Sequence, residues 1–295
     1  MKVNLKAAAG LVLSFGLWLA MPAQAEAIRV VSAGGSVTEI IFALGKGDIV
    51  VATDNTSTYP PEVEVITKLG YFRQLSAEGV LGQQPTHLIG AQATGPDAML
   101  NQVAGAGVNV TILDEQRSLA GLIEMISVVA KLLNADAAGD ELKRTILQDV
   151  EAARAQAKAA DIAGLTGLFV VANSERGLTV AGNDTVPQSL FDALGISNAA
   201  KQVNQYKLMD NESIVKARPD FILIASHAAT DDSAVTRLCD HPALAATPAG
   251  QHCTIAPLKS SIGLGLSPRY AQALQAVTQI AGQARAATRV QTKIR

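Results

Sequence analysis

The stretch Glu78-Gly-Val-Leu-Gly-Gln-Gln-Pro-Thr-His-Leu-Ile89 has a counterpart in the second half of the chain, Glu212-Ser-Ile-Val-Lys-Ala-Arg-Pro-Asp-Phe-Ile-Leu223. In each copy a short helical pattern stops before a proline, which disfavours helical backbone in the preceding residue, and a buried strand follows. A second matched pair, Glu39–Gly45 and Ser189–Gly195, occurs in the same order. Two matched pairs in one order predict that the chain consists of two similar lobes.

Strand and helix patterns alternate around these stretches. Runs rich in β-branched residues are separated by amphipathic segments, of which Asp97–Ala106 is one. Ser36 and Glu39 have the spacing of a capping box, so we expect them to begin the first helix. The alternation predicts an α/β fold with two Rossmann-like lobes, each built on a parallel sheet. The predicted strands are Ile28–Ser32, Ile49–Ala52, Thr86–Ile89, Val108–Leu113, Leu168–Ala172 and Phe221–Ala225.

The middle of the chain has a different pattern. Ala135–Ala160 contains no proline, is rich in strong helix formers and is polar on most faces. A solvated helix of this kind, on the order of 40 Å long at 1.5 Å per residue, bridges lobes rather than filling a core. We therefore divide the chain into a signal peptide (1–25), an N-terminal α/β lobe (26–134), a bridging helix (135–160) and a C-terminal α/β lobe (161–295).

The N-terminus has the pattern of a cleavable secretory signal. Lys2 and Lys6 precede an apolar run, Ala7–Ala20, and Ala23-Gln-Ala25 provides small residues for cleavage. The run is too short to span a membrane, so we expect a periplasmic protein that is not membrane-spanning. The formal net charge is −2 and there is no basic stripe, which argues against a nucleic-acid partner.

The chain contains two cysteines, Cys239 and Cys253. An even count in an oxidising compartment predicts a disulfide, which would stabilise the fold by about 3 kcal/mol in the chain-entropy model. His241 and His252 lie just inside the two cysteines, so a metal site is the alternative. The order Cys-x-His and His-Cys does not match the paired spacings of zinc modules, so we favour the disulfide.

Open α/β sheets bind ligands beyond the carboxyl ends of their strands. Two such sheets facing each other predict a ligand cleft between the lobes. This rule selects Gly34, Gly35, Ser36 and Asp54 from the first lobe, and Asn173, Arg176, Ser226, His227 and Lys259 from the second.

One further stretch, Lys68–Leu81, carries unusual chemistry. Tyr71 and Arg73 lie two residues apart, which in an extended segment places both on the same side. A neighbouring cation favours ionisation of a phenol, and a phenolate is one of the side chains that bind ferric haem iron. Alternatively, Tyr71 is a half-buried tyrosine beside an arginine without a role in binding.

Catalytic motifs are missing from the sequence. It contains neither a nucleophile elbow nor a dinucleotide fingerprint. His227 is the only histidine placed at the carboxyl end of a predicted strand, so the histidine cluster that bare zinc requires is missing.

Several of these features together resemble one family, the periplasmic haem-binding proteins of bacterial ABC haem importers. They are Ser36-Val-Thr-Glu39, Tyr59-Pro-Pro61, the segment Gly70-Tyr-x-Arg-x-Leu-Ser-x-Glu-Gly-Val-Leu81, the signal peptide and the mid-chain helix. The family belongs to a larger class of helix-bridged binding proteins that also bind corrinoids and ferric siderophores. The resemblance implies haem b (hemin) as a transported ligand rather than a catalytic cofactor, with an ABC permease and ATPase subunits as partners.

The resemblance also implies roles for individual residues. Tyr71 would bind the haem iron, with Arg73 as its partner. Some members place an opposing histidine in the loop that here reads Asn173-Ser-Glu-Arg176, so its absence favours one five-coordinate haem. His227 is a candidate basic partner from the second lobe.

Glu78 and Glu212 occupy matching positions, each seven residues before the proline of its repeat. The resemblance implies that they dock on the permease. Alternatively, they are solvated carboxylates that favour a helix start.

We therefore expect a monomeric periplasmic protein, not an enzyme, that captures haem and delivers it to an inner-membrane importer. The alternatives are a carrier of a ferric siderophore or corrinoid, and an exported hydrolase. Tyr59, Tyr206 and Tyr270 receive no role in this interpretation.

Overall fold

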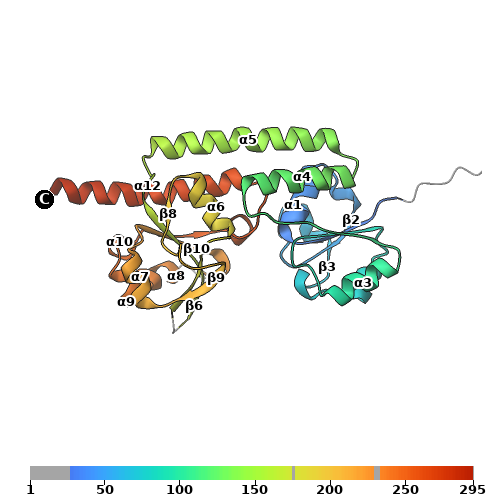
Figure 1. Cartoon of the computed structure of the whole chain (residues 1–295), viewed down its shortest axis with the longest axis horizontal. Helices are drawn as coiled ribbons and strands as arrows, with labels where there is room; N and C mark the ends of the chain where they lie inside the picture. Colours follow the sequence, from blue (N-terminus) through green and yellow to red (C-terminus); the bar gives the residue numbers. More distant parts are fainter. Residues whose placement is uncertain (1–26, 175–176, 229–232, 295) are drawn as a thin grey trace, which may run out of the picture.

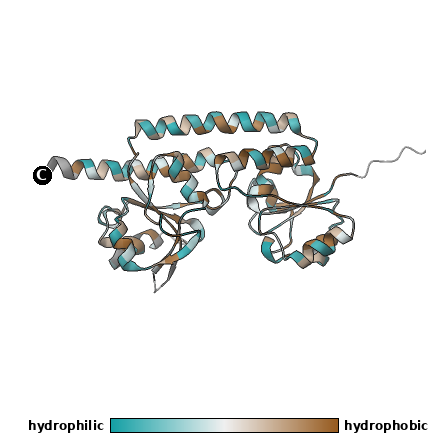
Figure 2. Ribbon diagram, in the orientation of Figure 1, coloured by the Kyte–Doolittle hydropathy of each residue, from teal (hydrophilic) through white to brown (hydrophobic). Residues whose placement is uncertain are grey.

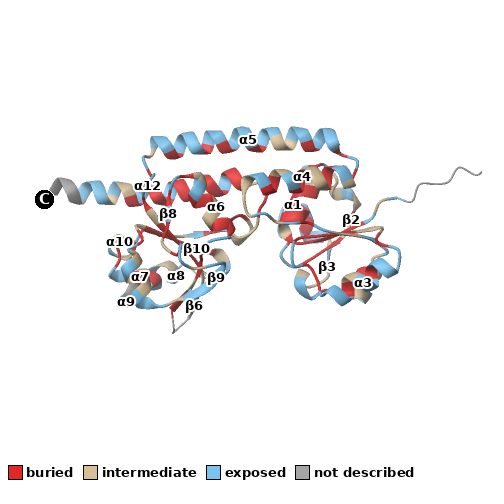
Figure 3. Cartoon of the chain, in the orientation of Figure 1, coloured by how far each residue is buried: buried red, intermediate tan, exposed pale blue. Residues whose placement is uncertain are grey.

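The computed structural model describes residues 27–174, 177–228 and 233–294, which form two α/β lobes side by side (Figure 1). The expected signal peptide lies outside these residues. Each lobe contains a sheet flanked by helices, and most of the strand residues are buried (Figure 3). The predicted two-lobed α/β architecture is confirmed.

The first lobe has a five-stranded parallel sheet in the order β3-β2-β1-β4-β5. The chain order reverses between β1 and β4, and open α/β sheets bind ligands at such a reversal. The strands are β1 (Val30–Ala33), β2 (Val50–Thr53), β3 (Thr67–Lys68), β4 (His87–Gly90) and β5 (Asn109–Ile112). The helices are α1 (Gly35–Ala43), α2 (Ala77–Leu81) and α3 (Asp97–Gly105), with 3-10 turns η1 (Gly47–Ile49), η2 (Pro61–Val65) and η3 (Phe72–Gln74).

The second lobe has a mixed sheet in the order β11-β10-β6-β7-β9, with β8 paired to β6. β11, β10 and β6 are parallel as expected, but β7 runs antiparallel to β6 and β9. Only residues 175–176 separate β6 from β7, and a parallel connection needs a crossover of about a dozen residues or more. The prediction of a wholly parallel second sheet is therefore wrong.

The strands of the second lobe are β6 (Thr166–Ser174), β7 (Gly177–Ala181), β8 (Ser197–Asn198), β9 (Tyr206–Met209), β10 (Phe221–Ala225) and β11 (Ile255–Leu258). Its helices are α6 (Val186–Ala193), α7 (Asn211–Ala217), α8 (Ser233–Cys239), α9 (Pro242–Ala245), α10 (Pro248–Gln251), α11 (Ser260–Gly263) and α12 (Tyr270–Ile294), with the 3-10 turn η4 (Ser226–Ala228).

Two helices connect the lobes, α4 (Leu119–Leu132) and α5 (Asp136–Ala159). α5 spans both lobes and packs against α4 and α12 (Figure 1). α5 is hydrophilic along much of its length, whereas α4 is largely hydrophobic (Figure 2). The buried side of α5 includes Ile146 and Val150. Both belong to one hydrophobic cluster with Ile40 of the first lobe and Phe191 of the second. The lobes therefore share a core through these helices.

The two copies of the internal repeat occupy equivalent places in the lobes. α1 and α6 are each followed by a glycine with left-handed backbone, Gly45 (φ 71°) and Gly195 (φ 69°). α2 leads through Pro85 into β4, and α7 leads through Pro219 into β10. The sequence pairs thus correspond to equivalent helix and strand pairs.

The first helix does not begin with the predicted capping box. Its N-cap is Gly34, whose φ of 105° favours glycine, and a Cβ there would lie 2.6 Å from the Ala91 Cβ. The Gly34 N–H donates to Asp54 Oδ1 at 2.8 Å. Ser36 and Glu39 lie inside the helix, and the Ser36 hydroxyl donates to Glu115 at 2.9 Å. Asp54 directly follows β2, the strand that pairs with β1, and this position brings its carboxylate to the Gly34 N–H.

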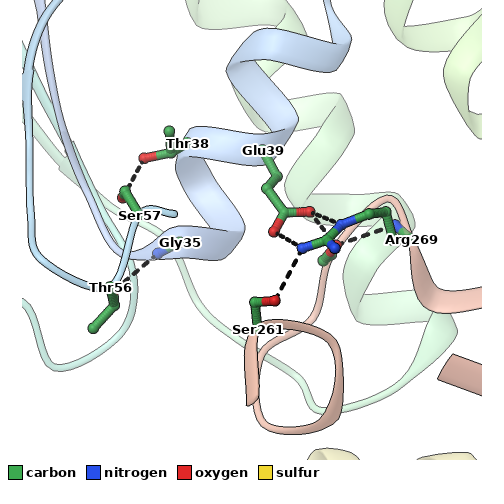
Figure 4. Close-up of polar contacts among 8 residues, drawn as sticks. Gly35, Thr38, Glu39, Thr56, Ser57, Ser261 and Arg269 are labelled. Atoms are coloured by element: carbon green, nitrogen blue, oxygen red, sulfur yellow. Dashed lines mark hydrogen bonds and ion pairs between the residues drawn. The ribbon is translucent and has the colours of Figure 1, made fainter. Parts of the chain in front are cut away.

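Glu39 instead forms a buried ion pair between the lobes (Figure 4). Arg269, which precedes α12, donates from Nε to Glu39 Oε2 at 2.8 Å and from Nη2 to Oε1. The hydroxyl of Ser267 also donates to Oε2, and Arg269 Nη2 donates to Ser261 at 3.1 Å. The Arg269 guanidinium also lies 4.0 Å from the ring centroid of Tyr59 in the first lobe. These contacts fix the two lobes to each other.

We expect Glu39→Gln to lower the free energy of unfolding by about 3 kcal/mol or more, because it leaves the Arg269 charge buried without its partner. Urea unfolding followed by circular dichroism measures the loss. The matched control is Glu151→Gln, since Glu151 pairs with Arg154 on the exposed surface of α5. The Glu151→Gln substitution should lower the free energy of unfolding by about 1 kcal/mol or less. Equal losses in the two variants would contradict a structural role for the buried pair.

Candidate ligand-binding site

The loop that carries Tyr71 is held by backbone hydrogen bonds on both sides. The carbonyl of Gly70 accepts from the N–H of Asn55 at 2.8 Å, and the carbonyl of Phe72 accepts from the N–H of Gly95 at 3.0 Å. The Phe72 side chain packs against two hydrophobic clusters. Tyr71 itself is 42% exposed. The fold therefore presents the Tyr71 ring to solvent from a fixed backbone.

Arg73 reaches Tyr71 by a different route from the one predicted. Tyr71 is extended, but Phe72–Gln74 form the 3-10 turn η3, so the expected extended segment is wrong. The turn places the Arg73 guanidinium 5.9 Å from the Tyr71 ring centroid and 5.3 Å from that of Phe72. Both distances lie within the range of cation–π attraction, about 6 Å. Arg73 is therefore a cationic neighbour of Tyr71.

Two of the expected lining residues of the first lobe, Asp54 and Ser36, are buried and form hydrogen bonds within that lobe. Asp54 is 1% exposed and also accepts hydrogen bonds from the Ser57 hydroxyl at 2.7 Å and the Thr56 N–H at 2.8 Å. Ser36 is 8% exposed, and its hydroxyl donates a hydrogen bond to the Glu115 carboxylate. Gly35 is half-buried at the first turn of α1.

His227 and Lys259 of the second lobe lie at the carboxyl ends of adjacent parallel strands, β10 and β11. His227 is exposed in η4, and its Nδ1 lies 2.8 Å from the Ser260 hydroxyl. Lys259 is exposed and directly precedes that serine. Asn173 lies in β6 opposite Leu178 of β7, and Arg176 is outside the described residues.

Charged residues of both lobes meet near the Tyr71 loop. Arg117, which precedes α4, forms an ion pair with Asp184 of the second lobe, with 3.0 Å between Nη1 and Oδ2. Burial raises the pKa of Glu115, although its hydrogen bond from Ser36 and the charges of Arg117 and Arg73 act in the opposite direction. Arg73, Glu115 and Arg117 therefore form a charged group at the edge of the first lobe.

The sequence interpretation missed Tyr206, which begins β9 in the second lobe. It is 38% exposed, and the charges of Arg117, Glu115 and Arg73 act on its phenol. Partial burial raises the pKa of Tyr206 to about 12. No motif surrounds this residue, so only the strand alternation of Tyr206 and Leu208 could have drawn attention to it.

Glu78 and Glu212 have the same position in the two lobes. Each is the second residue of its helix, α2 or α7, and each is exposed. The caps also match, because Ser76 and Asp210 each accept a hydrogen bond from the backbone N–H three residues later, at 3.1 and 2.8 Å. The carboxylates are therefore free to contact another molecule.

Cys239 and Cys253 are joined by a disulfide with a Cα–Cα distance of 5.3 Å. It links the end of α8 to the segment before β11. Within the described ranges, no group of three histidine, cysteine, aspartate or glutamate side chains is arranged to hold a metal ion.

None of the helices in the described part of the chain combines the length and the apolar character that crossing a bilayer requires.

Comparisons with known proteins agree with this architecture. A family model described as "Periplasmic binding protein" matches residues 30–261. The uncharacterized ABC transporter substrate-binding lipoprotein YvrC of Bacillus subtilis is 26% identical over 201 residues, which is 67% of this chain but only 63% of that protein. The vitamin B12-binding protein of Vibrio parahaemolyticus is 23% identical over 205 residues, covering 69% of this chain and 73% of that protein.

Solved structures match over a larger share of the chain. The periplasmic heme-binding protein RhuT from Roseiflexus sp. RS-1 superposes with a TM-score of 0.81 and 35% identity, covering 88% of this chain and 99% of RhuT. The heme-binding protein HutB of Vibrio cholerae superposes with a TM-score of 0.75 and 34% identity, covering 85% of this chain and 98% of HutB. The periplasmic heme-binding protein BhuT, in complex with two hemes, superposes with a TM-score of 0.82 and 31% identity, covering 87% of this chain and 98% of BhuT. The chain therefore belongs to the periplasmic binding protein family.

Proposed function

We propose that this protein binds haem between its lobes, with the Tyr71 phenolate on the iron, and delivers it to the permease and ATPase subunits of an ABC importer. The observation that carries the proposal is the geometry of Tyr71, an exposed phenol on a fixed backbone with the Arg73 guanidinium beside it. The likeness to RhuT, a periplasmic heme-binding protein, supports haem as the ligand.

Arg73 has two uses in such a site. Its positive charge favours the ionised phenol, which is the form that binds ferric iron. The guanidinium can also pair with a haem propionate, because a planar fork of N–H groups matches a carboxylate. We propose His227 as a basic partner of Tyr71 from the second lobe. The proposed lining of the site consists of Gly35, Ser36, Asn173, Arg176 and Lys259. Ser36 would contribute by holding the Glu115 carboxylate through its hydrogen bond.

We propose a single haem per protein. The loop 173–176 contains no histidine that could bind a second iron from the other lobe. BhuT was solved with two hemes, and saturation of this chain at one equivalent of hemin would distinguish it from that arrangement.

A corrinoid is the second candidate ligand. The vitamin B12-binding protein of Yersinia pestis is 32% identical over 109 residues, although these are only 37% of this chain and 38% of that protein. With a corrinoid the Tyr71 hydroxyl would not bind iron, and its ring would serve for packing only. Removal of that hydroxyl therefore distinguishes the two ligands.

We expect Tyr71→Phe to shift the Soret band of the hemin complex and to weaken hemin binding by about tenfold or more, ~1.4 kcal/mol or more. The substitution keeps the ring and removes only the ligating oxygen. The control is Tyr270→Phe, because Tyr270 is buried and its hydroxyl contacts Ser189. An unchanged spectrum and affinity in Tyr71→Phe would reject the ligand assignment and make His227 the next residue to replace.

We also propose that Glu78 and Glu212 dock on cationic residues of the permease. Replacing both with lysine should abolish hemin transport into cells or proteoliposomes while hemin affinity stays unchanged. The control is the double lysine substitution of Glu62 and Glu64, two exposed carboxylates of η2, which alters the net charge equally. If the Glu78 and Glu212 variant transports hemin as well as this control, the docking role is wrong.

A further inference from the structure

The edge strand β9 presents two large side chains to solvent. Tyr206 is 38% exposed and Leu208 is 50% exposed. Alternate residues of a strand point to the same face, so the phenol and the leucine lie side by side. Among the residues that the structure describes, β9 is the last strand of its sheet and pairs with β7 alone. The side chains of Tyr206 and Leu208 form an apolar edge of the second lobe, which we call the β9 edge.

The strand register places the β9 edge beside the first lobe. Tyr206 pairs with Ala181, and three residues after Ala181 the side chain of Asp184 contacts Arg117 of the first lobe at 3.0 Å. The phenol of Tyr206 is within electrostatic reach of Arg117 and also of Arg73. Arg73 is in turn 5.9 Å from the Tyr71 ring centroid. Arg73 therefore contacts Tyr71 of the first lobe, and its charge also acts on Tyr206 of the second lobe.

The Tyr206 hydroxyl is available as a hydrogen-bond donor. Burial raises the pKa of Tyr206 to about 12, so its phenol stays protonated at neutral pH and can donate a hydrogen bond. No group in the described part of the chain forms a hydrogen bond with this hydroxyl, whereas the hydroxyl of Tyr270 is bonded to Ser189. A neutral donor beside a guanidinium suits an anion, because the two can share its oxygens.

We infer that Tyr206 is a ligand-positioning residue: its hydroxyl and the Arg73 guanidinium hold one carboxylate of the ligand, while the β9 edge covers the apolar part of the macrocycle. The inference rests on the proposed haem site and adds the second-lobe contact that orients the ligand. A tetrapyrrole with carboxylate side chains fits this pair of groups. A ligand without a carboxylate would offer the Tyr206 hydroxyl only a neutral, weaker acceptor.

The test compares hemin with hemin dimethyl ester, in which both carboxylates are blocked. A hydrogen bond to a charged group is among the stronger ones, so Tyr206→Phe should weaken hemin binding by about tenfold. The affinity for the dimethyl ester should fall much less, because an ester carbonyl is a neutral and weaker acceptor than a carboxylate. The Soret band should keep its position because Tyr71 still binds the iron. Leu208→Ala should weaken the binding of both compounds by the same factor.

Tyr270→Phe serves as the control, since it removes a phenol oxygen that lies in the core. Equal hemin affinity in Tyr206→Phe and the parent protein would overturn the inference, as would an equal loss for hemin and its ester. Either result would leave the proposed function intact as long as the parent protein binds hemin. Failure of the parent protein to bind hemin would instead overturn the proposed function.

Discussion

The buried ion pair between Glu39 and Arg269 is the constraint on which the site geometry depends. Glu39 lies in α1, which starts at the carboxyl end of β1, and Arg269 precedes α12, which packs along α5. Each charge would be costly to bury alone, so the lobes cannot separate here without exposing or breaking the pair. Together with the core shared through α5, this pair holds the two lobes in fixed relation. We therefore expect the lobes to move little when a ligand binds.

Local patterns were sufficient for the architecture. The internal repeat, the prolines before β4 and β10 and the solvated helix α5 all depend on neighbouring residues, and the structure has them where the sequence indicates. The capping box failed because a tertiary contact outcompeted it: Glu39 pairs with Arg269, 230 residues away. The antiparallel β7 was missed because its hairpin with β6 was interpreted as the loop at the end of a strand.

The site itself was predictable only in part. Tyr71 and Arg73 share a short segment, so their association was visible in the sequence, although the turn that joins them was not. The polar residues at strand ends have two different roles. Asp54 is buried and accepts a hydrogen bond from the Gly34 backbone, whereas His227 is exposed to solvent. Tyr206 had no motif around it, because strand register and an ion pair between the lobes, rather than neighbouring residues in the sequence, set its surroundings.

We propose that the surface around Tyr71 binds haem rather than another large chelate. Parallel titrations of the purified protein with hemin and with cyanocobalamin, followed by absorbance and equilibrium dialysis, test it most directly. We expect an intense Soret band that saturates at one hemin per protein, with no retained cobalamin. Saturable retention of cobalamin without specific uptake of hemin would contradict it.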